Sequence, residues 1–137
     1  MIDRWFRRLA AAAALGCAAP LSVAAEAPRK TVAVYSNVCF HAQSGDILGE
    51  RVFLFRVRDG FQVLFQEAIG EMQLPILEKA LVSGDQIRVE LHRRSEGPSI
   101  FVGSITPETI TGSYLNGDGR RITLTRQHEE EHGFPNC

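Results

Sequence analysis

Short segments in which apolar and polar residues alternate follow one another through the middle of the chain. In one of them, Ile87, Val89 and Leu91 alternate with Arg88 and Glu90. The same period of two recurs in the segments that begin near residues 53, 61 and 122. Successive side chains of a strand point to opposite faces, so this pattern predicts sheets with one buried side and one side in water.

Turn-forming residues separate these segments. Asp59-Gly60 stands between two apolar runs, and the stretch from Asn116 to Gly119 stands between two others, which is the signal of a tight hairpin. Together the segments and their joins predict eight antiparallel strands, at residues 31–42, 48–58, 61–69, 75–82, 86–94, 99–105, 109–115 and 120–126.

The segment at 75–82 has two interpretations. Leu74, Leu77 and Leu81 have helical spacing, and Pro75 suits the first turn of a helix. A turn at residues 83–85 then joins the segment directly to the next predicted strand, which favours a hairpin and therefore a strand.

Eight consecutive strands with short joins form a meander. An open meander would expose the edges of its first and last strands, whereas closure into a barrel pairs those two strands with each other. We therefore predict an all-β fold, an antiparallel up-and-down eight-stranded barrel.

Residues 1–25 have a different composition. Arg4, Arg7 and Arg8 precede an uncharged, alanine-rich stretch of about 17 residues, close to the lower limit for crossing a bilayer. A basic start, an apolar centre and small residues at the end predict a secretory signal helix that is cleaved after Ala25. The expected mature protein is one barrel domain at residues 26–137 with a C-terminal tail, periplasmic or secreted. The alternative is lipid anchoring through Cys17, because "ALGC" at residues 14–17 resembles a bacterial lipobox.

Removal of residues 1–25 takes away three arginines and one aspartate, so the formal charge falls from −1 to −3. An acidic balance argues against nucleic-acid binding and gives no general attraction to anionic lipid. Two cysteines remain, Cys39 and Cys137, and an even pair in an oxidising compartment predicts a disulfide.

The stretch "FVGSITPETITGSYLNGDGRRITLTR" resembles the closing hairpins of small secreted bacterial calycin-like domains, which are similar to the avidin and lipocalin barrels. The shared features are Ile110, Gly112, Tyr114, Leu124 and Arg126. The resemblance implies the same barrel fold. The glycine-any-tryptophan signature of lipocalins and the aromatic biotin site of avidin have no counterpart, so biotin binding is not implied.

The barrel lumen is the candidate binding site, because an eight-stranded barrel is either filled by its own side chains or holds one small ligand. We expect Phe53, Phe55, Phe61 and Phe65 to point inward, with the Tyr114 hydroxyl near the rim. These five residues would contact a small apolar ligand if space remains; the alternative is a packed core.

The tail contains His128, Glu129 and His132, the spacing of a zinc-protease helix. Such a helix needs an apolar back face and a third ligand, yet Gly133 and Pro135 follow at once. We therefore expect no metal site, no cofactor and no catalytic residue, and a zinc-dependent hydrolase is a remote alternative. The basic pairs Arg93-Arg94 and Arg120-Arg121 are expected to decorate strand ends.

The sequence thus predicts an exported, non-enzymatic β-barrel that binds a small apolar ligand or a component of the cell envelope. The alternative is a protein-interaction or inhibitor module that acts through its loops. No nucleic acid and no membrane span after processing are expected, and the sequence leaves the oligomeric state open.

Overall fold

The computed structural model describes residues 32–93, 97–128 and 133–137. The predicted signal helix, its cleavage point after Ala25 and the lipobox cysteine Cys17 lie outside these residues. The described chain consists of nine strands and no helix: β1 Val32–Ser36, β2 Cys39–His41, β3 Asp46–Val57, β4 Gly60–Met72, β5 Ile76–Ser83, β6 Gln86–Arg93, β7 Gly97–Ile105, β8 Thr109–Tyr114 and β9 Ile122–Arg126. Accordingly, no helix long and apolar enough to cross a membrane occurs in this part of the chain.

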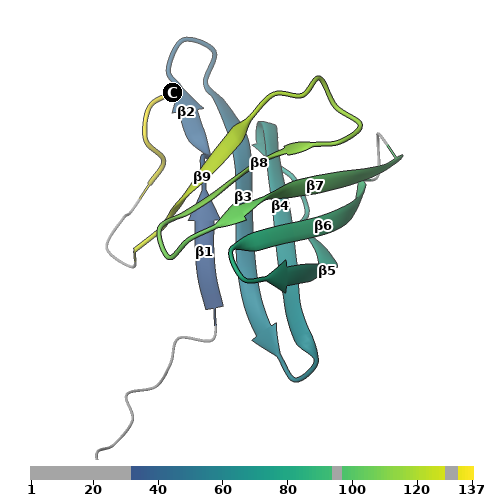
Figure 1. Cartoon of the computed structure of the whole chain (residues 1–137). Helices are drawn as coiled ribbons and strands as arrows, with labels where there is room; N and C mark the ends of the chain where they lie inside the picture. Colours follow the sequence, from purple (N-terminus) through teal and green to yellow (C-terminus); the bar gives the residue numbers. More distant parts are fainter. Residues whose placement is uncertain (1–31, 94–96, 129–132) are drawn as a thin grey trace, which may run out of the picture.

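The strands form one closed antiparallel barrel (Figure 1). Consecutive strands pair in chain order from β3 to β9, and β1 closes the circle because it pairs with β9 on one side and with β3 on the other. β2 continues the path of β1 and pairs with β3. The first predicted strand is therefore divided into β1 and β2, and the prediction of an eight-stranded up-and-down barrel is confirmed.

Most strand ends lie close to the positions that the turn-forming residues predict. β5 is a strand, so the helical interpretation of its leucine spacing was wrong. The β3–β4 hairpin is tight as predicted, with Val57 opposite Gly60. The predicted tight hairpin between β8 and β9 was wrong, because residues 115–121 form a wider loop whose Asn116 side chain binds the backbone of Pro98 and Ile100 on β7.

The barrel interior is an apolar core drawn from nearly every strand. Its buried members are Tyr35, Val52, Leu54, Val63, Phe65, Ala80, Ile87, Val89, Leu91, Phe101, Ile110 and Leu124. Because directly paired residues share a face, the register of Val52 with Phe65 and of Leu54 with Val63 fixes which side of β3 faces inward.

The prediction that Phe53 and Phe55 point into the lumen was wrong. Val52 and Leu54 occupy the inner face of β3, and the two phenylalanines lie on the outer face, where Phe53 is flanked by Val34 and Leu64. Residues 52–55 are all apolar, so the period of two cannot decide which alternate pair is buried.

Two glycines allow β7 and β8 to approach closely. Gly103 and Gly112 are directly paired. A Cβ atom on Gly112 would overlap the Val102 carbonyl oxygen and the Phe101 ring, and one on Gly103 would overlap the Thr111 carbonyl. The absence of side chains at this pair is therefore a packing requirement.

The break between β1 and β2 bends the chain toward β3. The Asn37 N–H donates to the Glu50 carbonyl (3.0 Å), and the Glu50 N–H donates to the Asn37 side-chain oxygen (2.6 Å). The Val38 N–H donates to Ser36 Oγ (3.0 Å) and not to a neighbouring strand. The bend consequently satisfies its own hydrogen bonds and leaves the path of a regular barrel strand.

The C-terminal residues return along the outside of β2. The Phe40 N–H donates to the Pro135 carbonyl (2.7 Å), and the Cys137 N–H donates to the Phe40 carbonyl (3.0 Å). Cys39 and Cys137 are disulfide-bonded with their Cα atoms 5.0 Å apart, which confirms the predicted pairing. The tail thus covers the edge of β2 that does not pair with β3 (Figure 1).

Candidate functional site

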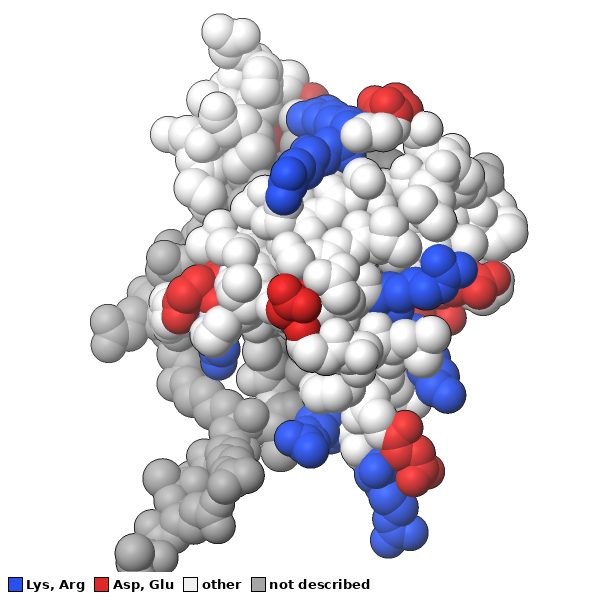
Figure 2. All heavy atoms as spheres, viewed as in Figure 1, with Lys and Arg blue, Asp and Glu red and all other residues white. Residues whose placement is uncertain are grey.

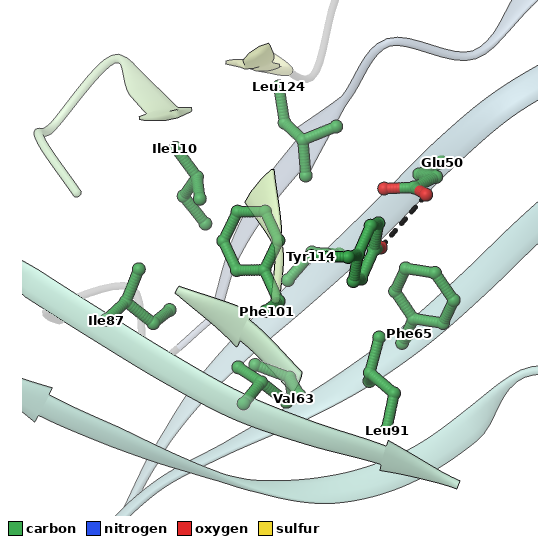
Figure 3. Close-up of a pocket in the computed structure, with 11 residues that line it drawn as sticks. Glu50, Val63, Phe65, Ile87, Leu91, Phe101, Ile110, Tyr114 and Leu124 are labelled. Atoms are coloured by element: carbon green, nitrogen blue, oxygen red, sulfur yellow. Dashed lines mark hydrogen bonds between the residues drawn. The ribbon is translucent and has the colours of Figure 1, made fainter. Parts of the chain in front are cut away.

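The predicted ligand site, the lumen, is filled by the protein's own side chains. Apolar side chains from β3, β4, β6, β7, β8 and β9 converge on one small space (Figure 3). The free volume between them is about 20 Å³, little more than the 10–15 Å³ that one water molecule requires. Pockets for small organic ligands usually measure about 300–1,000 Å³, so this lumen is packed as a core.

The five predicted lumen residues lie in different places. Phe65 and Tyr114 line the residual space (Figure 3). Phe61 packs against the core without lining this space. Phe53 and Phe55 are on the outer face, as described above. The structure therefore brings together two of the five side chains.

A polar pair lies at one end of the lumen. The Tyr114 hydroxyl donates to the Glu50 carboxylate (2.9 Å), and both groups are partly buried. The Tyr114 ring meets the Phe101 ring edge to face, with centroids 5.5 Å apart and an interplanar angle of 68°. β8 and β3 are not neighbours in the sheet, so the hydrogen bond links two strands that do not pair with each other.

Removal of this hydrogen bond should destabilise the barrel. We expect Tyr114→Phe to lower the free energy of unfolding by about 1.5–3 kcal/mol, the usual contribution of a hydrogen bond to a charged group. Tyr35→Phe is the second measurement, because it removes a bond to the Thr106 carbonyl (3.1 Å) and a side-chain contact with the Arg126 guanidinium. Urea unfolding measures both, and an unchanged free energy of unfolding in Tyr114→Phe would contradict a stabilising bond to Glu50.

Tyr35 closes the opposite end of the barrel and is 3% exposed. Burial raises the pKa of its phenol above the ordinary value of 10.0, while the nearby Arg126 opposes the shift. A raised pKa in the folded state means that the neutral phenol stabilises the fold. This stabilisation should be complete below pH 10 and should be lost as the pH rises through the folded-state pKa, which thermal unfolding of wild type and Tyr35→Phe between pH 8 and 11 would measure.

A cleft opens in the barrel wall where β9 and the β1–β2 break separate. The β1–β9 ladder contains two residue pairs and ends with Ser36 opposite Thr125. The cleft beyond it has a volume of about 590 Å³ and is lined by Asn37, Cys39, Leu48, Gly49, Glu50, Arg120, Arg121, Ile122, Thr123 and Cys137. We call it the seam cleft. Its floor reaches Glu50, which also borders the lumen.

Two arginines stand at the lip of the seam cleft. Arg120 and Arg121 are exposed and form no side-chain hydrogen bond or ion pair with the described residues. Figure 2 shows basic side chains gathered at the top of this face, over the β8–β9 loop. Glu50 is the one acidic side chain of the lining, beside the two arginines.

The sequence pattern predicts only that Arg120-Arg121 lie at a strand end. No local signal shows that they face the residue 37 bend, because their proximity depends on the closure of the barrel. The bend itself has a local signal: Ser36-Asn37, two turn-forming residues, interrupt an apolar run.

His128, the tail histidine that the structure describes, is not part of a cluster of metal-ligating side chains among the described residues. His128 Nε2 lies 3.7 Å from a Glu108 carboxylate oxygen, and both side chains are about two-thirds exposed. Glu129 and His132 lie outside the described residues. Within residues 32–93, 97–128 and 133–137, no three His, Cys, Asp or Glu side chains are grouped to hold an ion.

Comparison of this chain with protein-family models, with curated proteins and with solved structures finds no match.

Proposed function

We propose that this protein is an exported, non-enzymatic barrel that binds a polypeptide partner of the cell envelope with its outer surface. The observation that carries the proposal is the filled lumen, with about 20 Å³ of free space. A barrel without room for a ligand acts as a rigid scaffold, and its exposed openings and loops are then the surfaces left for recognition.

Two further features support this function. The N-terminal pattern of basic, apolar and small residues is that of an export signal. The disulfide between Cys39 and Cys137 suits an oxidising compartment, where protein disulfides persist. Both features are consistent with a protein that works outside the cytoplasm.

The test is chemical cross-linking in intact cells, followed by native mass spectrometry of the protein purified from its own host. We expect a chain that begins at Glu26, contains one disulfide, and is cross-linked to a second polypeptide. A chain that carries a stoichiometric small apolar molecule and no cross-linked polypeptide would overturn the proposal. A bound zinc ion lost in His128→Ala and His132→Ala would instead support the hydrolase alternative.

A further inference from the structure

The backbone edge of β9 is open to solvent at the seam cleft. The register of the β1–β9 ladder would bring Val38 opposite Thr123, two positions beyond the last observed pair. The Val38 N–H donates to Ser36 Oγ instead, so the ladder stops before Thr123. β2, the next segment, pairs with β3 and with the tail, not with β9.

The direction of the Thr123 backbone follows from its neighbours. The Arg126 N–H donates to the Glu108 carbonyl just before β8, and the Gln127 N–H donates to the Val34 carbonyl on β1. Backbone groups alternate between the two sides of a strand, so the N–H and C=O of Thr123 face the β1 side, as those of Gln127 do. There they form no hydrogen bond with any described residue, and Thr123 is exposed.

An unpaired strand edge is a template for another extended chain, and addition of a strand is a recurring mode of peptide recognition. The seam cleft offers about 590 Å³ beside this edge, which is within the range of ligand-binding pockets. Its walls include Leu48, which is 37% exposed and provides an apolar contact for an inserted side chain.

The two arginines of the seam cleft determine which kind of polypeptide segment it would bind. The guanidinium groups of Arg120 and Arg121 pair best with carboxylates, which they bind through two parallel hydrogen bonds. The Glu50 carboxylate is on the floor of the cleft and already accepts the Tyr114 hydroxyl, whereas the two arginines stand at the lip. We infer that the seam cleft binds an extended, acidic segment of the partner polypeptide, which adds as a strand to β9 at Thr123.

This inference rests on the proposed function and names the chemistry of its partner. The test uses the disulfide-bonded mature protein, residues 26–137, labelled for NMR. The probe is an acetylated heptapeptide of alternating valine and glutamate with an amidated C-terminus, and the control probe has lysine in place of glutamate. We expect the acidic probe to shift the backbone signals of Thr123, Asn37 and Gly49 with a micromolar to millimolar Kd, and the lysine probe to leave them unchanged.

Two variants separate the backbone and charge contributions. Thr123→Pro removes a donor that faces the cleft and leaves the β8–β9 ladder intact, because a strand-edge proline is tolerated there; it should abolish probe binding. The double variant Arg120→Ala/Arg121→Ala should weaken binding about tenfold at low salt. The matched control, Arg56→Ala/Arg58→Ala at the β3–β4 turn on the opposite end of the barrel, should bind as wild type does. Circular dichroism checks that each variant is folded.

Several outcomes would overturn the inference. These are signal shifts away from the seam cleft, equal binding of both probes, or undiminished binding by folded Thr123→Pro. Concentration-dependent shifts at Thr123 without a probe would assign the edge to a second copy of the chain. Tighter probe binding after replacement of Glu129, Glu130 and Glu131 by glutamine would assign it to the protein's own tail. If a polypeptide still cross-links to the protein in cells, these results contradict only the inference that the seam cleft binds it. If no polypeptide cross-links, the proposed function is contradicted as well.

Discussion

Reduction of the Cys39–Cys137 disulfide is expected to lower the free energy of unfolding of the barrel by about 4–5 kcal/mol. The bond joins residues 98 positions apart and therefore restricts the unfolded chain from residue 39 to residue 137. Small domains are stable by about 5–15 kcal/mol in total, so this loss is a large share. Urea unfolding of the wild type with and without a phosphine reductant measures it.

The double variant Cys39→Ser/Cys137→Ser should reproduce the reduced state and be insensitive to the reductant. Hydrogen exchange locates the effect. The amides of Phe40 and Cys137, which hold the tail to β2, should exchange faster after reduction because the tail opens locally. Those in the centre of the β6–β7 ladder should exchange faster only to the extent that the global free energy of unfolding falls. Unchanged exchange at Phe40 would show that the tail is held without the sulfur bond.

Truncation of Ile110 should have an effect of similar size from a different cause. Ile110 is 1% exposed and packs in the core opposite Leu124. The lumen has little free space, so the lost side chain leaves a void, and Ile110→Ala should cost about 2–5 kcal/mol in the free energy of unfolding. Thermal and urea unfolding provide the measurement.

The matched control is the same substitution on the surface. Ile69 on β4 is 60% exposed, and Ile69→Ala should change the free energy of unfolding by about 0.5 kcal/mol or less. Similar costs at the two positions would mean that Ile110 is not in a close-packed interior, and the conclusion that the lumen is filled would then be withdrawn.

Local chemistry explains which parts of the fold could be predicted. The strands at residues 61–69, 86–94 and 99–105 were located because alternating side chains and turn residues report on a strand and its ends directly. β5 was decided by its short join to β6. Leu77 and Leu81 occupy the outer face of this strand, and Leu74 lies before it. Barrel closure and the disulfide followed from edge pairing and from the even cysteine count.

The remaining features depend on register between distant residues. Four consecutive apolar residues at 52–55 fit either face of β3, and the partner strands β1 and β4 decide the matter. The filled lumen depends on how side chains from many strands interlock, which composition does not report. The seam cleft arises because residues near 37 turn away from residues near 123, a relation that no local pattern contains.

The pairing of β1 with β9 also sets an order of events during biogenesis. Tyr35 cannot pair with Arg126 until almost the entire chain has been synthesised and, for an exported chain, translocated. Contacts of such long range form late and slowly in folding. Until then β1 carries an unpaired edge and the apolar side chains of the lumen are uncovered, so the nascent protein should depend on holding chaperones before the barrel closes.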